Sequence, residues 1–134
     1  MQAYARGKYV PGSAQKARLV IDLIRGRLVN EALTILKFTK KRAAKPIEKV
    51  LRAAIANAQQ LAEKKNISVD VDNLYINKCY VDIGATKFRR RIRPAPMGRA
   101  YRERRHQCHI TVYVSSKASG QEAKSSAAAE SKRS

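Results

Sequence analysis

Acidic residues are scarce in this sequence of 134 residues, which has 10 Asp and Glu against 29 Lys and Arg and a formal net charge of +19. The acids stand singly along the chain, so the sequence offers no carboxylate pair for hydrolytic chemistry. A positive excess of this size favours anionic partners such as nucleic acid or acidic lipid. We therefore expect a binding protein and not an enzyme acting on small molecules.

Long apolar runs and cysteine clusters are also missing. Asp22 interrupts "LVIDLI", and the start "MQAYARGKYVPG" lacks the apolar core of a signal peptide, so we expect a soluble, cytoplasmic protein. Cys79 and Cys108 are too few and too far apart for a disulfide scaffold or a paired-cysteine zinc knuckle. Two buried or half-buried thiols are expected, although a symmetric turn near residues 93–94 would place them opposite each other and permit a disulfide.

Histidine is limited to His106 and His109. Together with Cys79 and Cys108 they suggest a metal cluster, and beside the arginines they suggest the acid and base of a ribonuclease. Alternate residues of a strand point to opposite faces, so His106 and His109 do not share a face, and neither do Cys108 and His109. We expect no metal, no cofactor and no catalytic site.

Three helices are predicted before residue 66 of a single domain. "SAQKARLVIDLIRG" has Ser13 as its N-cap and Gly26 as a left-handed C-cap. "NEALTILKF" has Asn30 in the capping position of a short second helix. From about residue 39 to 65 an apolar stripe indicates the core helix, in which Pro46 either belongs to the first turn or causes a kink. The stripe consists of Ile47, Val50, Leu51, Ala54, Ile55, Ala58, Leu61 and Ala62.

Strands are predicted on either side of residue 95. Alternation begins at Ile67 and continues to Ile83, with phase slips that indicate a turn near residues 72–73 and a later bulge. "CHITVYVSS" alternates cleanly, and "QAYARGKYV" is a third, weaker candidate. Residues 1–115 are therefore expected to form the domain. The tail 116–134, rich in Ser, Ala and charge, is expected to be disordered.

Between these strands lies "KFRRRIRPAPMGRAYRERR", residues 87–105, with eight arginines, one lysine and the single acid Glu103. If the flanking strands pair, the segment from about residue 80 to 108 is a hairpin that reaches roughly 45 Å from the domain, at ~3.3 Å per residue. Pro94 and Pro96 cannot donate ladder hydrogen bonds, so they belong at its tip or in an open arm. Arginine binds phosphates bidentately and stacks on bases, which suits structured RNA.

Several of these stretches together resemble the L-twenty-two family of bacterial-type large-subunit ribosomal proteins. They are "SAQKARLVIDLIRG", "KVLRAAIANA", "RIRP", "GRAYR" and "HITV", in the order of that family. The resemblance implies an α+β fold of three helices packed on a small antiparallel sheet, with a long protruding β-hairpin. It also implies a structural role in the large ribosomal subunit, binding of the large (23S-type) ribosomal RNA and support of subunit assembly.

The same resemblance implies the partners and the site. The hairpin would line the exit tunnel, next to the nascent polypeptide, and would meet the L-four protein at the constriction among the neighbouring ribosomal proteins. The RNA-binding residues would be Lys16, Arg18, Arg25, Lys87, Arg89, Arg90, Arg91, Arg93, Arg99, Arg102, Arg104 and Arg105. The tunnel tip would be Arg91, Ile92, Arg93, Pro94, Ala95 and Pro96.

Alternatives remain open for some of these residues. Lys16, Arg18 and Arg25 also fit ordinary charge on a helix surface. Phe88 and Tyr101 could stack on bases or pack within the hairpin. A DNA-binding protein would normally offer a basic recognition helix, and a membrane-surface protein would need a basic helix with bulky apolar anchors, whereas here the densest charge lies in the hairpin.

Overall fold

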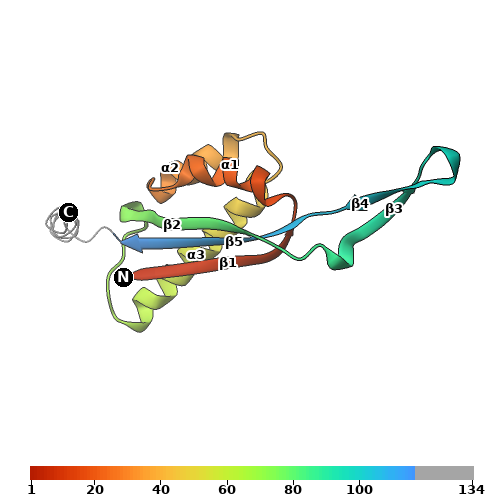
Figure 1. Ribbon diagram of the computed structural model, residues 1–134. Helices are drawn as coiled ribbons and strands as arrows, with labels where there is room; N and C mark the ends of the chain where they lie inside the picture. Colours follow the sequence, from red (N-terminus) through yellow and green to blue (C-terminus); the bar gives the residue numbers. More distant parts are fainter. Residues whose placement is uncertain (117–134) are drawn as a thin grey trace, which may run out of the picture.

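The computed structural model of the chain describes residues 1–116, except for the side chain of Arg89. The expected disordered tail therefore lies outside the described residues, apart from Ser116, which is the last residue of a strand. The rest forms a domain of three helices and a sheet, from which a thin hairpin projects (Figure 1). This α+β arrangement confirms the predicted fold class.

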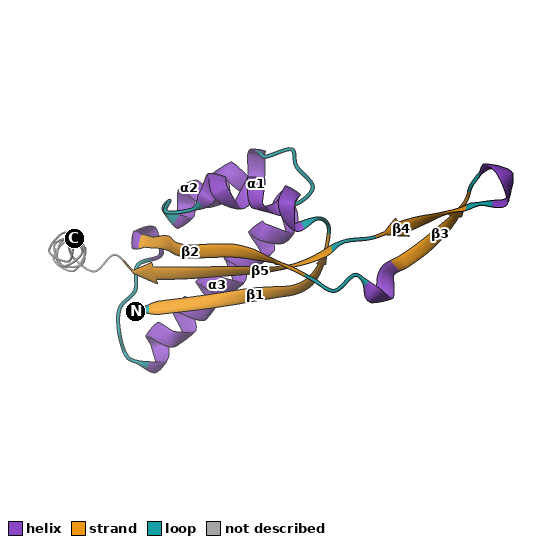
Figure 2. Ribbon diagram, in the orientation of Figure 1, coloured by secondary structure: helices purple, strands orange, loops and turns teal. Residues whose placement is uncertain are grey.

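The main sheet has three antiparallel strands in the order β1-β5-β2, with β5 in the centre. These are β1 (Gln2–Pro11), β2 (Leu74–Ile83) and β5 (Gln107–Ser116). A separate two-stranded sheet, β3 (Arg90–Pro94) with β4 (Ala100–Arg104), forms the hairpin, which points away from the helices and the main sheet (Figure 2). The weak N-terminal strand prediction is thus confirmed.

One face of the main sheet is covered by helices, and it forms the core. Helix α1 (Ala14–Ile24) packs on β2, α3 (Ala44–Lys64) packs on β1 and β5, and α2 (Val29–Phe38) lies against both helices. The register explains which side chains are buried, because Ala5, Val112 and Cys79 lie side by side on adjacent strands and all point to the helices. The predicted stripe of α3 faces the same core, and Ile55 and Leu61 are its partly buried members.

Two predicted helix starts need correction. The second helix begins at Val29 with Leu28 as its N-cap, and Asn30 lies inside it, where its side chain donates a hydrogen bond of 2.8 Å to Asp72. Leu28 forms an isolated bridge with Tyr75, which holds the chain extended up to that residue. The N-cap position is therefore set by a tertiary contact and not by a capping side chain.

The third helix begins at Ala44, not near residue 39, and Pro46 lies in its first turn. A proline is compatible with the first turn because the N–H groups there have no helical partner. Ser13 is the N-cap of α1 as predicted, although its side chain makes no capping hydrogen bond. Gly26 has a left-handed backbone with φ of 76° just after the C-cap of α1, which confirms its predicted role.

The strand prediction was too long at its N-terminal end. Residues 67–70 form no strand, residues 71–73 form a 3₁₀ turn, and β2 begins at Leu74. The side chain of Asp70 accepts a hydrogen bond of 3.2 Å from the N–H of Asp72 and so stabilises the turn. The turn near residues 72–73 and the later bulge are both present, the latter as a register shift between Ile76 and Lys78.

Within residues 1–116, none of the helices is both long and apolar enough to pass through a lipid bilayer.

Candidate nucleic-acid interface

The hairpin of β3 and β4, called the arm below, carries arginines on both of its faces. Arg90 lies opposite Arg104, and Ile92 lies opposite Arg102, so these residues share one face. The other face is formed by Arg91, Arg93, Tyr101 and Glu103. Every residue of β3 is exposed. The first face therefore presents three arginines without an acid, and this is the face best suited to a chain of phosphates.

The single acid of the arm is paired within it. Nε and Nη2 of Arg93 donate hydrogen bonds of 2.8 and 3.2 Å to the two carboxylate oxygens of Glu103. The two residues are diagonal neighbours across the strands, because Arg93 lies opposite Tyr101. This bidentate pair neutralises the one negative charge of the arm. Among the ion pairs of residues 1–116, no other involves an arm cation.

The turn at the tip lies further along the chain than predicted. Pro94 is the last residue of β3 and lies opposite Ala100, so the turn is centred on Met97 and not near residues 93–94. Of the predicted tip, only Ala95 and Pro96 belong to the turn. The other four residues, Arg91, Ile92, Arg93 and Pro94, form strand β3.

Left-handed backbone at two successive residues explains the position of the turn. Met97 and Gly98 have φ of 60° and 69°, and the N–H of Ala95 donates a hydrogen bond of 3.0 Å to the carbonyl of Arg99. Glycine adopts this conformation readily, so Gly98 is the signal that locates the turn. The side chain of Met97 is 95% exposed.

Two aromatic side chains, one just before the arm and one in it, are accessible. Phe88 is 89% exposed and Tyr101 is 62% exposed. This exposure leaves both rings accessible for stacking on a partner, which stays a prediction.

The arm joins the domain through a break in the hydrogen-bond ladder. Ile83 lies opposite Cys108 in the main sheet, and the next pair is Arg90 with Arg104 in the arm. Between these two pairs the chain advances seven residues on the β2–β3 side, from 83 to 90, but only four on the β4–β5 side, from 104 to 108. The longer side contains a 3₁₀ turn at Lys87–Arg89. In the main sheet Cys108 pairs with Ile83 and Cys79 with Val112, so the juxtaposition of the two cysteines that a symmetric turn near residues 93–94 would give does not occur.

Gly84 marks the point where the main sheet ends. Its N–H donates a hydrogen bond of 2.8 Å to the carbonyl of Gln107. A Cβ at Gly84 would lie 3.0 Å from that carbonyl oxygen, so a side chain there would require the backbone to shift by a few tenths of an ångström. Glycine is needed here for close approach of two backbones.

Both thiols are free and buried. Cys79 lies opposite Val112 and not opposite Cys108. Burial raises the pKa of the Cys79 thiol, and Arg25 nearby opposes this effect, while burial alone raises the pKa of the Cys108 thiol. Both thiols therefore stay protonated and unreactive near neutral pH. The described part of the chain contains no group of three or more potential metal ligands.

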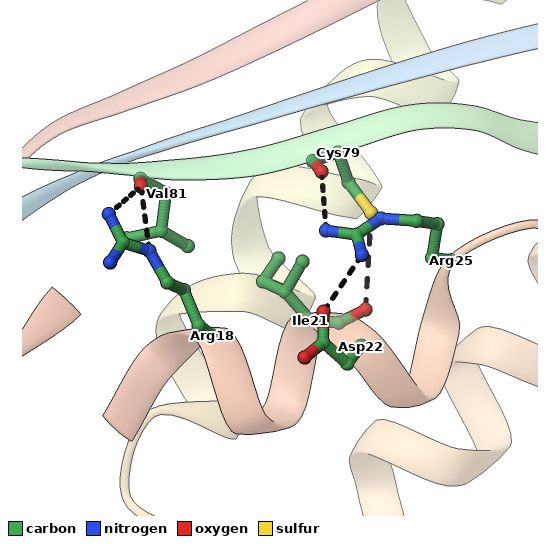
Figure 3. A network of polar contacts seen from close by, with 6 residues as sticks. All are labelled: Arg18, Ile21, Asp22, Arg25, Cys79 and Val81. Carbon is green, nitrogen blue, oxygen red and sulfur yellow. Dashed lines mark hydrogen bonds and ion pairs between the residues drawn. The ribbon is translucent and has the colours of Figure 1, made fainter. Parts of the chain in front are cut away.

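Arg18 and Arg25 extend from α1 and its C-cap to the edge of β2 (Figure 3). Nε and Nη2 of Arg18 donate hydrogen bonds of 3.3 and 3.1 Å to the carbonyl of Val81. Nη2 of Arg25 donates one of 3.1 Å to the carbonyl of Cys79, and its Nη1 donates one of 2.8 Å to Asp22. The two guanidinium groups thus satisfy carbonyls of an edge strand.

The three predicted RNA-binding residues of the first helix therefore differ in their surroundings. Arg18 and Arg25 have a structural function on β2, and RNA contact by them stays a prediction. Lys16 has no ion pair or side-chain hydrogen bond within residues 1–116 and lines a pocket.

This pocket, called the base pocket below, has a volume of about 630 Å³ and lies where the arm leaves the domain. Its cations come from three segments: Lys16 in α1, Arg42 just before α3, and Arg105 between β4 and β5, where His106 also lines the pocket. Glu103 also lines it. The sequence analysis missed Arg42, because nothing in the local pattern shows that the loop before α3 meets the arm.

The face of the main sheet opposite the helices carries tyrosines. Tyr113 in β5 lies between Tyr4 and Tyr80, with ring centroids 5.4 and 6.4 Å apart. Tyr9 meets His109 edge-on at 4.9 Å. The alternation of β5 indicated that Tyr113 faces away from the core, but only the register brings the other rings beside it.

Comparison with known sequences decides the family. Residues 5–115 match the family described as Ribosomal protein L22p/L17e. The chain belongs to this family. It is therefore a ribosomal protein and not an enzyme, as the resemblance implied.

The similarity to related proteins covers most of the chain. Those of Solibacter usitatus and Halothermothrix orenii are both 50% identical to it, over 87% and 90% of this chain and 98% and 100% of their own lengths. That of Bacteroides fragilis is 46% identical over 89% of this chain and 84% of its own length. All three are named large ribosomal subunit protein uL22.

Proposed function

We propose that the chain is a structural constituent of the large ribosomal subunit in the cytoplasm, where it binds the large (23S-type) ribosomal RNA and supports subunit assembly. The membership of the family and the names of its relatives support the assignment to that subunit. The observation that carries RNA binding is the arm, a projecting hairpin whose exposed arginines have only one acid among them, itself neutralised by Arg93.

The arm also suits the lining of the exit tunnel for nascent polypeptides. It is thin and projects from the domain (Figure 1), and its two faces differ. The face with Arg90, Arg102 and Arg104 would lie on the RNA. The face with Tyr101 and the Arg93–Glu103 pair is less charged, because the acid neutralises one of its two arginines. The tip at Ala95–Arg99 would meet the L-four protein at the constriction, and other neighbouring ribosomal proteins would contact the domain.

The physical basis of binding is neutralisation of phosphates with release of their counterions. Guanidinium groups add bidentate hydrogen bonds to phosphate oxygens and stacking on bases. A two-stranded ribbon is only marginally stable in water, and this one has no buried side chain in β3. Contact with RNA would therefore stabilise the arm as well as anchor the domain.

The salt dependence of RNA binding tests the proposal. If ~8 of the nine cations of residues 87–105 each meet a single-strand-like phosphate, log affinity falls with log salt at a slope of about −5 to −6. Deletion of residues 85–103 should flatten this slope on large-subunit RNA fragments. The deletion is compatible with the fold because Gly84 and Gln107 are already hydrogen-bonded, so a short loop can close the strands.

A variant of unchanged length is the matched control for the deletion. Replacing Arg90, Arg102 and Arg104 by Gln keeps the arm but removes the three charges of its acid-free face. This variant should fall between the full chain and the deletion. Equal slopes for all three proteins would refute the role of the arm.

Assembly provides a second test. A long arm cannot easily enter a closed RNA core, so it should be placed early in subunit assembly. Full-length protein added to preassembled particles that lack it should restore the RNA footprint of the domain but not that of the arm. Full restoration of the arm footprint would show that this order is wrong.

A further inference from the structure

The base pocket combines cations from parts of the molecule that are distant in the sequence. Lys16 and Arg42 belong to the domain, and Arg105 lies in the connection between β4 and β5, where the chain leaves the arm. Three positive charges around one cavity repel one another, which costs stability in the absence of an anion. None of the three has an ion pair or a side-chain hydrogen bond within residues 1–116, so their donors are available to a ligand.

The one acid of the pocket does not cancel this charge. The carboxylate of Glu103 is held by Arg93 through two hydrogen bonds. The Glu103–Arg93 pair is neutral as a unit, so the pocket keeps the full charge of Lys16, Arg42 and Arg105, with the imidazole of His106 as a further donor.

The rest of the lining gives the pocket an apolar floor. Val10, Ala17, Cys108 and Ile110 lie beneath it, and Lys16 and Arg42 are exposed, so a ligand can reach both cations from solvent. The volume of about 630 Å³ is in the range of sites for ligands of nucleotide size and exceeds what a single water-filled crevice requires.

We propose that the base pocket is a phosphate-binding site that holds one phosphodiester unit of RNA between the domain and the arm. The phosphate is contacted by Lys16 and Arg42 of the domain and by Arg105 at the base of the arm. Because the arm is joined to the domain through a broken ladder, few backbone hydrogen bonds fix its direction, and the bound phosphate supplies the missing connection. The identity of the phosphate as part of ribosomal RNA rests on the proposed function, whereas the pocket itself is testable with inorganic phosphate.

Nuclear magnetic resonance of the full chain is the direct test, because the protein has only two histidines. His106 lines the base pocket. His109 lies elsewhere, where its Nδ1 accepts a hydrogen bond of 3.0 Å from the N–H of Tyr9. Millimolar inorganic phosphate should shift the imidazole signals of His106 to saturation and leave those of His109 nearly unchanged. A His106→Asn variant assigns the signals. Equal, unsaturated shifts of both histidines would overturn the proposal.

Charge-neutral variants then locate the contact. Arg42→Gln and Arg105→Gln should each weaken phosphate binding, and binding of a large-subunit RNA fragment, by about threefold to tenfold. Lys41→Gln is the matched control, because it removes one positive charge from the same loop but does not line the pocket. Equal losses for Lys41→Gln and Arg42→Gln would overturn the site.

Backbone relaxation tests whether the bound phosphate fixes the arm relative to the domain. Saturation with phosphate should make the backbone ¹⁵N relaxation of residues 90–104 approach that of residues 74–83, and Arg105→Gln should abolish this change. An arm whose relaxation does not respond, despite a saturating shift of His106, would overturn the coupling. If no variant and no wild-type chain binds RNA at all, the proposed function fails, while the phosphate titration still decides the pocket.

Discussion

Arg93 in β3 and Glu103 in β4 join the two strands of the arm by a diagonal, bidentate ion pair, with hydrogen bonds of 2.8 and 3.2 Å. The arginine side chain is 66% exposed, so water screens the pair, and its contribution to stability is small. Its larger effect is on charge, because it occupies one arm cation that could otherwise meet a phosphate.

Glu103→Gln should therefore tighten RNA binding. The change frees Arg93, and we expect the slope of log affinity against log salt to become steeper by about 0.7, one additional single-strand-like phosphate contact. The free energy of unfolding should change by less than about 1 kcal/mol. Glu63→Gln on α3 is the control, since it changes the net charge equally away from the arm. Equal gains in affinity for the two variants would show that only net charge matters.

Arg18→Met should destabilise the domain. The change leaves the carbonyl of Val81 at the edge of β2 without its two hydrogen bonds from the guanidinium group. A lost hydrogen bond from a charged donor costs about 1.5–3 kcal/mol, which urea unfolding can measure. Lys16→Met, on the same helix but without a protein partner, should cost less than about 0.5 kcal/mol. Similar losses in the two variants would argue against the structural role of Arg18.

Gly7→Ala should be destabilising through a steric clash and not through backbone conformation. A Cβ at Gly7 would lie 2.7 Å from Cγ2 of Val50 on α3. Overpacking of this kind costs about 1–3 kcal/mol. Adding Val50→Ala removes the clashing atom, so the double variant should be more stable than the sum of the two single losses predicts. Strict additivity in thermal or urea unfolding would contradict the clash.

The stability of the fold should decrease at alkaline pH. Burial raises the pKa of Cys79 and Cys108, so the folded state holds these protons more tightly than the unfolded state. The resulting stabilisation is complete below the pKa of an unfolded thiol, about 8.5, and is lost as the pH rises through the folded values. The Cys79→Ala, Cys108→Ala double variant should show a weaker dependence between these pH values, measured by urea unfolding. An identical dependence would show that the thiols do not contribute.

Sequence reasoning succeeded where local chemistry decides the structure. The apolar stripe of α3, the left-handed Gly26 and the alternation of β5 each follow from the residues themselves. It failed where distant segments meet. Asn30 looked like a cap, but the bridge between Leu28 and Tyr75 starts the helix earlier.

The candidate site also has one part that the sequence predicts and one part that depends on tertiary packing. The charge of the arm is visible in the sequence, and so is the excess of arginine over lysine. The base pocket is not visible in the sequence, because Lys16, Arg42 and Arg105 are brought together only by the packing of α1, the loop before α3 and the connection between β4 and β5. The position of the tip was missed because it depends on the register of β2 with β5 and on the three additional residues on one side of the arm base, and composition carries no information about either.

The broken ladder at the base of the arm separates two registers. Ile83 pairs with Cys108 in the main sheet, whereas the arm has a different register that begins with the pair Arg90 and Arg104. Within a continuous hairpin, adding or removing one residue would reverse the orientation of every side chain beyond it. Here such a change can be absorbed in the 3₁₀ turn at Lys87–Arg89 before it reaches the core. The length and sequence of the arm can therefore change to fit a different binding partner, while the core of the domain keeps the same sequence.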